Sequence, residues 1–343
     1  MKTPRVAVIG AGAFGRNHLR VYRDIEAADP GALRLTAIVE PDPSRRSELA
    51  SKYDLAGFAS LDEALQADAA PPFDAASVCS PTIHHAAVAE RLLEAGIDVL
   101  IEKPFAATIE QADRVLALAE RNLRIVQIGH LERFNPAVTA AAERITRPMF
   151  FEAHRLSIFT PRSLDVDVVL DLMIHDLDVV LSLTNSPVRE VRAVGLPVLS
   201  PKVDIANVRV EFESGCVANF TASRVSTEQV RKLRLFQPHE YLSLDFARQE
   251  LLTIKVDPSL LAQLMAGGPS MPAEGSHPSR GLSLEKLDPS GAEPLRLELE
   301  DFLSSVRYRT RPRVTGEAGR AALALALEIN QQIAGHAHRA GLA

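Results

Sequence analysis

The feature that most constrains the fold is a glycine-rich turn close to the N-terminus. Gly10-Ala11-Gly12-Ala13-Phe14-Gly15 ends an apolar run that begins at Val6 and opens a segment with helical spacing. In a strand–turn–helix unit, such glycines permit a tight turn, a close backbone approach to a pyrophosphate, and close helix–strand contact. The helix N-terminus then favours the negative phosphates. Because both flanking elements are predicted, we expect a dinucleotide site with backbone contacts from Gly10, Gly12, Ala13, Phe14 and Gly15.

The first 130 residues carry four further apolar runs, separated by segments with helical spacing. These runs are Leu35–Glu40, Ala75–Ser80, Val99–Glu102 and Ile125–Gly129. Continuous apolar strands that alternate with helices are typical of a parallel sheet covered on both faces. We therefore predict a doubly wound parallel α/β domain over residues 1–130.

After about residue 150, short runs alternate apolar and polar residues. The runs at 208–212 and 217–223 flank the turn Glu213-Ser214-Gly215 and predict a β-hairpin. Further strands are expected at 191–195, 232–236, 241–246 and 251–256, with one helix over Val166–Leu183. We predict an α+β domain over residues 131–343 with a mainly antiparallel open sheet. It would include a surface loop at about 257–294 and C-terminal helices at about 297–340.

The composition excludes several classes of protein. The formal net charge of −6 gives no general attraction to nucleic acid or to an anionic membrane. Cys79 and Cys216 are too few for a disulfide framework and lack the paired spacing of a zinc site. No stretch approaches the ~18 uninterrupted apolar residues of a membrane span, and Met1–Arg5 leads into the first strand without a signal peptide. We expect a cytoplasmic protein.

An acidic residue at the end of the second strand bears on the choice of cofactor. Glu40 stands 25 residues after Gly15, where a carboxylate can accept hydrogen bonds from the adenine ribose. Because a carboxylate repels a 2′-phosphate, NAD is favoured over NADP. Arg45 and Arg46 leave NADP as the alternative if Glu40 points away, and a solvated Glu40 at a strand end is the other alternative.

The segment Glu102-Lys103-Pro104 closes the run that begins at Asp98. The carboxyl ends of parallel strands form the edge where open α/β sheets bind ligands. A lysine at this edge can hydrogen-bond a substrate oxygen and stabilise negative charge on it. If it is desolvated, it can also act as an acid or base. An ordinary Glu102–Lys103 ion pair is the alternative.

The helix predicted early in the second half carries Asp171, His175 and Asp178 on one face, since they are spaced i, i+4 and i+7. A histidine with a carboxylate one turn away is suited to taking a hydroxyl proton. A structural histidine is one alternative. Metal binding is another, but it needs a third ligand, for which the sequence offers only His84, His85, His130 and His154, and we expect no metal.

The glycine turn, Glu102-Lys103-Pro104 and Asp171…His175, in this order, resemble the Gfo/Idh/MocA oxidoreductases. The segment Ser80–His85 resembles that family's Thr-Pro-Asn-x-x-His, with Ser80 and Thr82 as departures. The resemblance covers nearly the whole chain. It implies a Rossmann domain for NAD(H) or NADP(H), an α+β substrate domain, and sugars, cyclitols or nucleotide sugars as substrates. It implies catalytic roles for Lys103, Asp171 and His175, and cofactor contacts from Ser80, Pro81, His85, Glu102 and Lys103.

A narrower resemblance rests on His130–Pro136, Glu152–Arg155 and the helix that follows. These segments look like the branch of the family that oxidises the 3-hydroxyl of UDP-N-acetylglucosamine or its uronic acid. Arginine is suited to bidentate contact with a diphosphate. The substrate-binding residues expected on this basis are Arg133, Asn135, His154, Arg155 and Arg162; solvated side chains or structural ion pairs are the alternative.

The chemistry expected is reversible oxidation of a secondary alcohol, with hydride transfer to a nicotinamide. His175 takes the hydroxyl proton, Lys103 hydrogen-bonds the same oxygen, and Asp171 orients one or both; whether Lys103 or His175 accepts the proton stays open. A free-sugar or inositol dehydrogenase is the alternative enzyme. A non-catalytic NAD-binding sensor or scaffold is the alternative of another class. A homodimer or homotetramer is expected, because an open sheet face needs cover.

Overall fold

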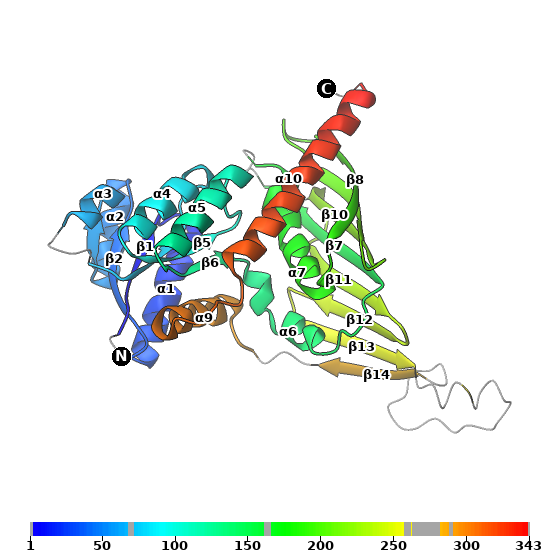
Figure 1. The fold of residues 1–343 in the computed structure, drawn as a ribbon, viewed down its shortest axis with the longest axis horizontal. Helices are drawn as coiled ribbons and strands as arrows, with labels where there is room; N and C mark the ends of the chain where they lie inside the picture. The colour runs from blue at the N-terminus through cyan, green and yellow to red at the C-terminus, as the bar shows by residue number, and fades with distance from the viewer. Residues whose placement is uncertain are drawn as a thin grey trace. The chain divides into compact units, whose positions relative to one another are not determined.

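A computed structural model of the chain describes residues 3–67, 72–160, 166–256, 262, 282–287 and 291–341. The chain forms two compact units, drawn in Figure 1. The first comprises Met1–Phe134 and Glu293–Ala324, and the second comprises Asn135–Ala292 and Leu325–Ala343. The sequence analysis assigns all C-terminal helices to the second domain. The structure differs, because one of these helices is part of the core of the first unit.

The first unit is built on a six-stranded parallel sheet with the order β3-β2-β1-β4-β5-β6. Every strand pair in it is parallel. The predicted doubly wound fold is thus confirmed. The short edge strand β3 is the one strand of this sheet that the sequence analysis does not predict. The strands are β1 (Arg5–Ile9), β2 (Arg34–Val39), β3 (Ala56–Phe58), β4 (Ala75–Val78), β5 (Asp98–Glu102) and β6 (Val126–Gly129).

Helices cover both faces of this sheet. In Figure 1, α4 (Thr82–Glu94) lies beside α5 (Ile109–Arg121), and α1 (Ala13–Ala28) lies beside α9 (Pro294–Tyr308). Leu299 and Phe302 of α9 are fully buried in one core cluster with Leu19 and Tyr22 of α1, which places α9 in this unit. The remaining short elements are α2 (Pro43–Tyr53), α3 (Leu61–Leu65) and the 3-10 helix η1 (Leu131–Phe134).

The second unit is built on an eight-stranded sheet with the order β14-β13-β12-β11-β7-β10-β9-β8. All its strand pairs are antiparallel except β7–β10, which is parallel, so the predicted mainly antiparallel sheet is confirmed. The strands are β7 (Phe150–Ile158), β8 (Val188–Leu196), β9 (Ile205–Phe212), β10 (Val217–Ser226), β11 (Val230–Gln237), β12 (Glu240–Asp245), β13 (Glu250–Val256) and β14 (Leu282–Leu287).

Two strands of this sheet were not predicted from the sequence. Strand β7 carries Arg155 at a buried position, so its inward-facing residues do not read as an apolar stripe. Strand β14 lies within the segment predicted as a loop and pairs with β13, which corrects that prediction for residues 282–287. Most of the remaining predicted loop lies outside the described residues.

The helices of the second unit are α6 (Pro136–Ala142), a π-helix η2 (Val169–Met173), α7 (Ile174–Thr184) and the last part of α10 (Gly316–Arg339). Helix α6 packs on β12 and β13, and α7 packs on β7. Along β9 and β11, buried residues alternate with exposed ones, so one sheet face is covered and the other is open. No helix in the described part of the chain has the length and apolar character of a membrane span.

Candidate active site

The glycine turn between β1 and α1 shows why each glycine is needed. Gly10 has φ +88°, and a Cβ there would lie 2.8 Å from the Ser80 amide nitrogen. A Cβ on Gly15 would lie 2.0 Å from the Gly10 carbonyl oxygen. At Gly12, by contrast, a Cβ would meet no atom within 4 Å. Two glycines thus serve the packing of the turn, while Gly12 leaves open space at the helix N-terminus that fits a pyrophosphate.

Glu40 follows β2 and is bound to this same turn. Its buried carboxylate accepts the Ala11 amide at 2.8 Å through Oε2, and the Asp42 amide at 3.0 Å through Oε1. The Arg45 guanidinium lies 3.3 Å from Oε1. Glu40 therefore does not point away from the turn, and Arg45 partly neutralises its charge. A carboxylate in this place fits ribose hydroxyls and disfavours a 2′-phosphate.

The segment after β4 carries Ser80, Pro81 and His85. Both ring nitrogens of the buried His85 lie 2.8 Å from backbone carbonyls, those of Ser80 and Pro104. Burial lowers the pKa of His85 and outweighs these carbonyls, which favour the imidazolium. His85 thus ties the turn after β4 to the turn after β5. The buried hydroxyl oxygen of Ser80 has no hydrogen-bond partner among the described residues.

Lys103 follows β5 at the carboxyl edge of the sheet and is partly buried. The carboxylate of the preceding Glu102 lies 2.9 Å from Nε2 of His18, and both side chains are buried. His18 is not among the site residues predicted from the sequence, in which it is marked by its position on the apolar face of α1.

Asp171 and His175 lie across the junction between the π-helix η2 and α7. Both are partly buried, whereas Asp178 is buried. The regular α-helix expected over 166–183 is therefore corrected, because a π-turn widens the spacing just before His175. Single π-turns inside helices occur frequently at functional sites. Among the described residues, no group of three or more His, Cys, Asp or Glu side chains is arranged to hold a metal ion.

The residues expected to bind substrate differ in their elements, their burial and their partners. Arg155 forms a bidentate ion pair of 2.9 and 2.8 Å with Asp176, and both side chains are buried. The side-chain oxygen of Asn135 caps α6 by accepting the Ala137 amide. Its side-chain nitrogen donates to the carbonyl of Phe246, the residue that follows β12. Partly exposed His154 lies 4.0 Å from Glu152, Arg133 is in η1, and Arg162 lies outside the described residues.

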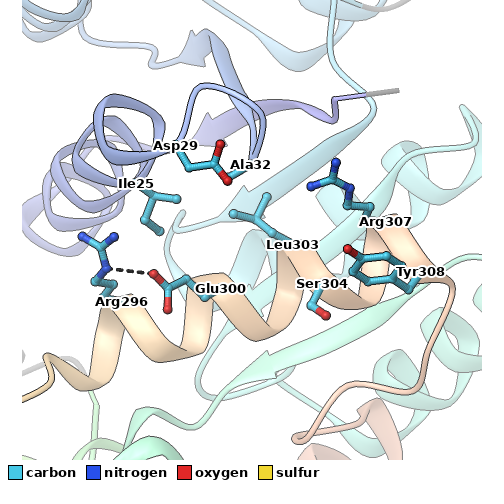
Figure 2. A pocket seen from close by; sticks show the side chains of 9 residues that line it. All are labelled: Ile25, Asp29, Ala32, Arg296, Glu300, Leu303, Ser304, Arg307 and Tyr308. Atoms are coloured by element: carbon cyan, nitrogen blue, oxygen red, sulfur yellow. Dashed lines mark hydrogen bonds and ion pairs between the residues drawn. The ribbon is translucent and has the colours of Figure 1, made fainter. Parts of the chain in front are cut away.

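A separate pocket of about 260 Å³ lies between α1 and α9 in the first unit (Figure 2). Figure 2 shows Arg296 and Glu300 of α9 paired at its rim, at 2.8 Å, beside the apolar side chains of Ile25 and Leu303. None of the predicted site residues lines this pocket. We therefore assign the candidate active site to the glycine turn and the strand ends, not to this pocket.

Comparison with known proteins bears on this assignment. Residues 4–130 match the oxidoreductase family with an NAD-binding Rossmann fold, and residues 141–236 match the GFO/IDH/MocA C-terminal domain. The chain is 36% identical to UDP-N-acetylglucosamine 3-dehydrogenase of Acidithiobacillus ferrooxidans over 95% of this chain and 96% of that protein. The chain belongs to the Gfo/Idh/MocA oxidoreductase family.

Solved structures of the family agree with the fold. A structure of the Acidithiobacillus ferrooxidans enzyme superposes with a TM-score of 0.84 at 34% identity, covering 97% of this chain and 98% of that one.

Among relatives compared by sequence, an inositol 2-dehydrogenase from Leifsonia xyli subsp. xyli is 33% identical, over 54% of this chain and 55% of that protein. The predicted family, the enzyme class of NAD-binding oxidoreductase and the two-part architecture are confirmed for this Gfo/Idh/MocA member.

The glycine turn of this Gfo/Idh/MocA protein gives a paired prediction. Gly12→Ala should raise the Kd for NAD on the order of tenfold with an unchanged Tm, because the added methyl occupies only the open space. Gly15→Ala should lower the Tm by about 5 °C or more, because its methyl overlaps the Gly10 carbonyl. Calorimetric titration measures the Kd for NAD, and thermal denaturation measures the Tm. Equal NAD affinity in Gly12→Ala and wild type would show that the pyrophosphate lies elsewhere.

Proposed function

We propose that this protein oxidises the 3-hydroxyl of UDP-N-acetylglucosamine, or of a closely related UDP-N-acetylhexosamine, with NAD. The observation that carries the proposal is the similarity along nearly the whole chain to an enzyme named for that reaction. The similarity to inositol 2-dehydrogenase, in contrast, extends over only about half of each chain. A nucleotide sugar is therefore favoured over a free sugar or inositol.

The residues of this chain divide the work as follows. Bound NAD supplies an acceptor for the hydride that leaves the alcohol carbon. The open space at Gly12 and the N-terminus of α1 receive the pyrophosphate, and Glu40 receives the adenine ribose. Lys103 hydrogen-bonds the alcohol oxygen. His175 accepts the proton of the alcohol hydroxyl or shares that proton with Lys103. Asp171 orients these groups.

The test is NADH formation, followed by absorbance, with UDP-N-acetylglucosamine, UDP-glucose, N-acetylglucosamine and myo-inositol as alcohols. The proposal predicts the highest kcat/KM with UDP-N-acetylglucosamine, and product analysis should locate the new carbonyl at carbon 3. A higher kcat/KM with a free sugar or inositol contradicts it. NAD binding without oxidation of any of these alcohols would favour the sensor or scaffold alternative.

We further propose that the protein works in the cytoplasm as a homodimer or homotetramer. The open face of the eight-stranded sheet, with exposed side chains such as Asn207, Arg209 and Arg234, supports self-association. Light scattering coupled to size exclusion measures the mass of the assembly. A monomer at assay concentration contradicts this part of the proposal.

The contacts of Glu40 predict the cofactor preference. Glu40→Ser should raise the ratio of kcat/KM with NADP to that with NAD by about 10²-fold, because it removes a charge that repels a 2′-phosphate and releases Arg45. The ratio is measured by NADH or NADPH formation on one substrate. In Glu40→Ser/Arg45→Ala most of this gain should be lost. An unchanged ratio in Glu40→Ser would remove Glu40 from cofactor discrimination.

A further inference from the structure

A buried carboxylate stands directly before the lysine at the sheet edge. Glu102 is 7% exposed, and its Oε1 lies 2.9 Å from Nε2 of His18, which is 0% exposed. These residues are 84 positions apart in the sequence, one on β5 and one on α1. A buried acid is costly unless it is hydrogen-bonded. His18 therefore supplies the contact that keeps Glu102 in the interior.

The carboxylate is also confined from the neighbouring strand. Glu102 pairs in register with Gly129, the last residue of β6. A Cβ on Gly129 would lie 2.7 Å from Oε1 and 2.9 Å from Cδ of Glu102. The carboxylate thus occupies the space that a side chain at residue 129 would fill. With His18 at hydrogen-bond distance and Gly129 against it, Glu102 has one well-defined position.

His18 is linked in turn to the glycine turn. Its ring packs against that of Phe14, with centroids 5.4 Å apart, and Phe14 lies between Gly12 and Gly15. The His18–Glu102 pair therefore connects two segments whose relative position matters for a reaction at this site. One segment is the turn that fits the pyrophosphate, and the other is the strand end that carries Lys103.

Fold stability alone does not explain this pair. An apolar pair of similar volume would often fill such a space with equal or greater stability, since two polar groups must lose their water. On the same helix, one turn later, Tyr22 forms a second buried hydrogen bond, to Ser77 at 2.8 Å. That bond joins α1 to Ser77 of β4 and not to β5. Tyr22→Phe removes it but keeps the ring that lies 6.2 Å from the ring of His18, so it provides a matched loss of one buried hydrogen bond.

We propose that His18 is a positioning residue for the oxidation: through Glu102 it holds Lys103 at a fixed place relative to the glycine turn. This inference rests on the proposed function in that Lys103 must act on the substrate alcohol. Because His18 is fully buried, we assign it no contact with substrate or cofactor. Its removal should therefore affect the turnover step more than cofactor binding, because a displacement of about 1 Å of a reacting group can cost about 10²-fold in rate.

The experiment compares His18→Leu, His18→Gln and Tyr22→Phe in the full chain. His18→Leu should lower kcat about 10- to 100-fold while the Kd for NAD changes less than about twofold. His18→Gln can still donate to Glu102 and should recover most of the lost rate. Tyr22→Phe should keep the wild-type kcat, even if its Tm falls as much as that of His18→Leu. Equal loss of kcat in His18→Leu and Tyr22→Phe, or no recovery in His18→Gln, overturns the proposal.

A second readout separates this inference from the proposed function. The emission of NADH bound in the binary complex reports the surroundings of the nicotinamide ring without any substrate. His18→Leu should shift this emission, and His18→Gln and Tyr22→Phe should not. If the wild type oxidises no sugar but His18→Leu alone shifts the emission, the proposed function fails and the positioning role stands. An unshifted emission in His18→Leu contradicts the positioning role.

Discussion

Lys103→Met should lower kcat by about 10²- to 10⁴-fold, which is the usual contribution of a group that assists proton transfer. The reason is its place: Lys103 follows β5 at the edge of the sheet where ligands bind, next to the turn after β4 that His85 ties to Pro104. Methionine keeps the length of the side chain but removes the ammonium group that, in the proposed mechanism, stabilises charge on the alcohol oxygen. NADH formation on the preferred alcohol measures the loss.

Two controls make this prediction specific. The Kd for NAD should be nearly unchanged in Lys103→Met, because the proposal assigns the pyrophosphate to the glycine turn and the adenine ribose to Glu40. Lys52→Met, a lysine on the surface helix α2, should keep the wild-type rate. A near-normal kcat in Lys103→Met would remove Lys103 from the mechanism and, with it, the role proposed for His18.

The sequence predicts the first unit well because its signals are local. Apolar runs mark β1, β2, β4, β5 and β6, and the glycines mark the turn that opens α1. The second unit is less visible from the sequence. Arg155 faces inward on β7 and breaks the apolar pattern, and its pairing with Asp176, 21 residues away, offsets the cost of burying its charge. Helix α9 was assigned to the wrong unit because its packing on α1 leaves no local trace.

The candidate site shows the same difference between local signals and contacts that are distant in the sequence. Residues within short motifs, such as Gly10, Glu40 and Glu102, could be singled out from their places in the turn and at the strand ends. Their partners could not, because each is distant in the sequence: Ala11 for Glu40 and His18 for Glu102. The π-turn before His175 was also missed, since helical spacing is the same in a sequence whether or not one turn is widened.

His175→Ala should lower kcat by about 10²- to 10⁴-fold and remove the acid limb of the pH profile of kcat/KM. A protonated imidazole cannot accept the hydroxyl proton, so the wild-type rate should fall at low pH, and the variant should lack that fall. His84→Ala, an exposed histidine on α4, should change neither the rate nor the profile. Rates measured across the pH range on one substrate give both quantities, and an unchanged acid limb in His175→Ala would exclude this histidine as proton acceptor.

The double variant Lys103→Met/His175→Ala decides whether the two groups act on one oxygen. If they act as one coupled unit on that oxygen, the effects are strongly non-additive, and the double variant should be scarcely slower than the slower single variant. If each group contributes independently of the other, the fold-losses multiply. The cycle also bears on the proton acceptor: with a coupled pair, the acid limb belongs to both groups, so it should shift in Lys103→Met and disappear only in His175→Ala. Multiplying losses together with an unshifted limb would contradict joint action on one alcohol oxygen.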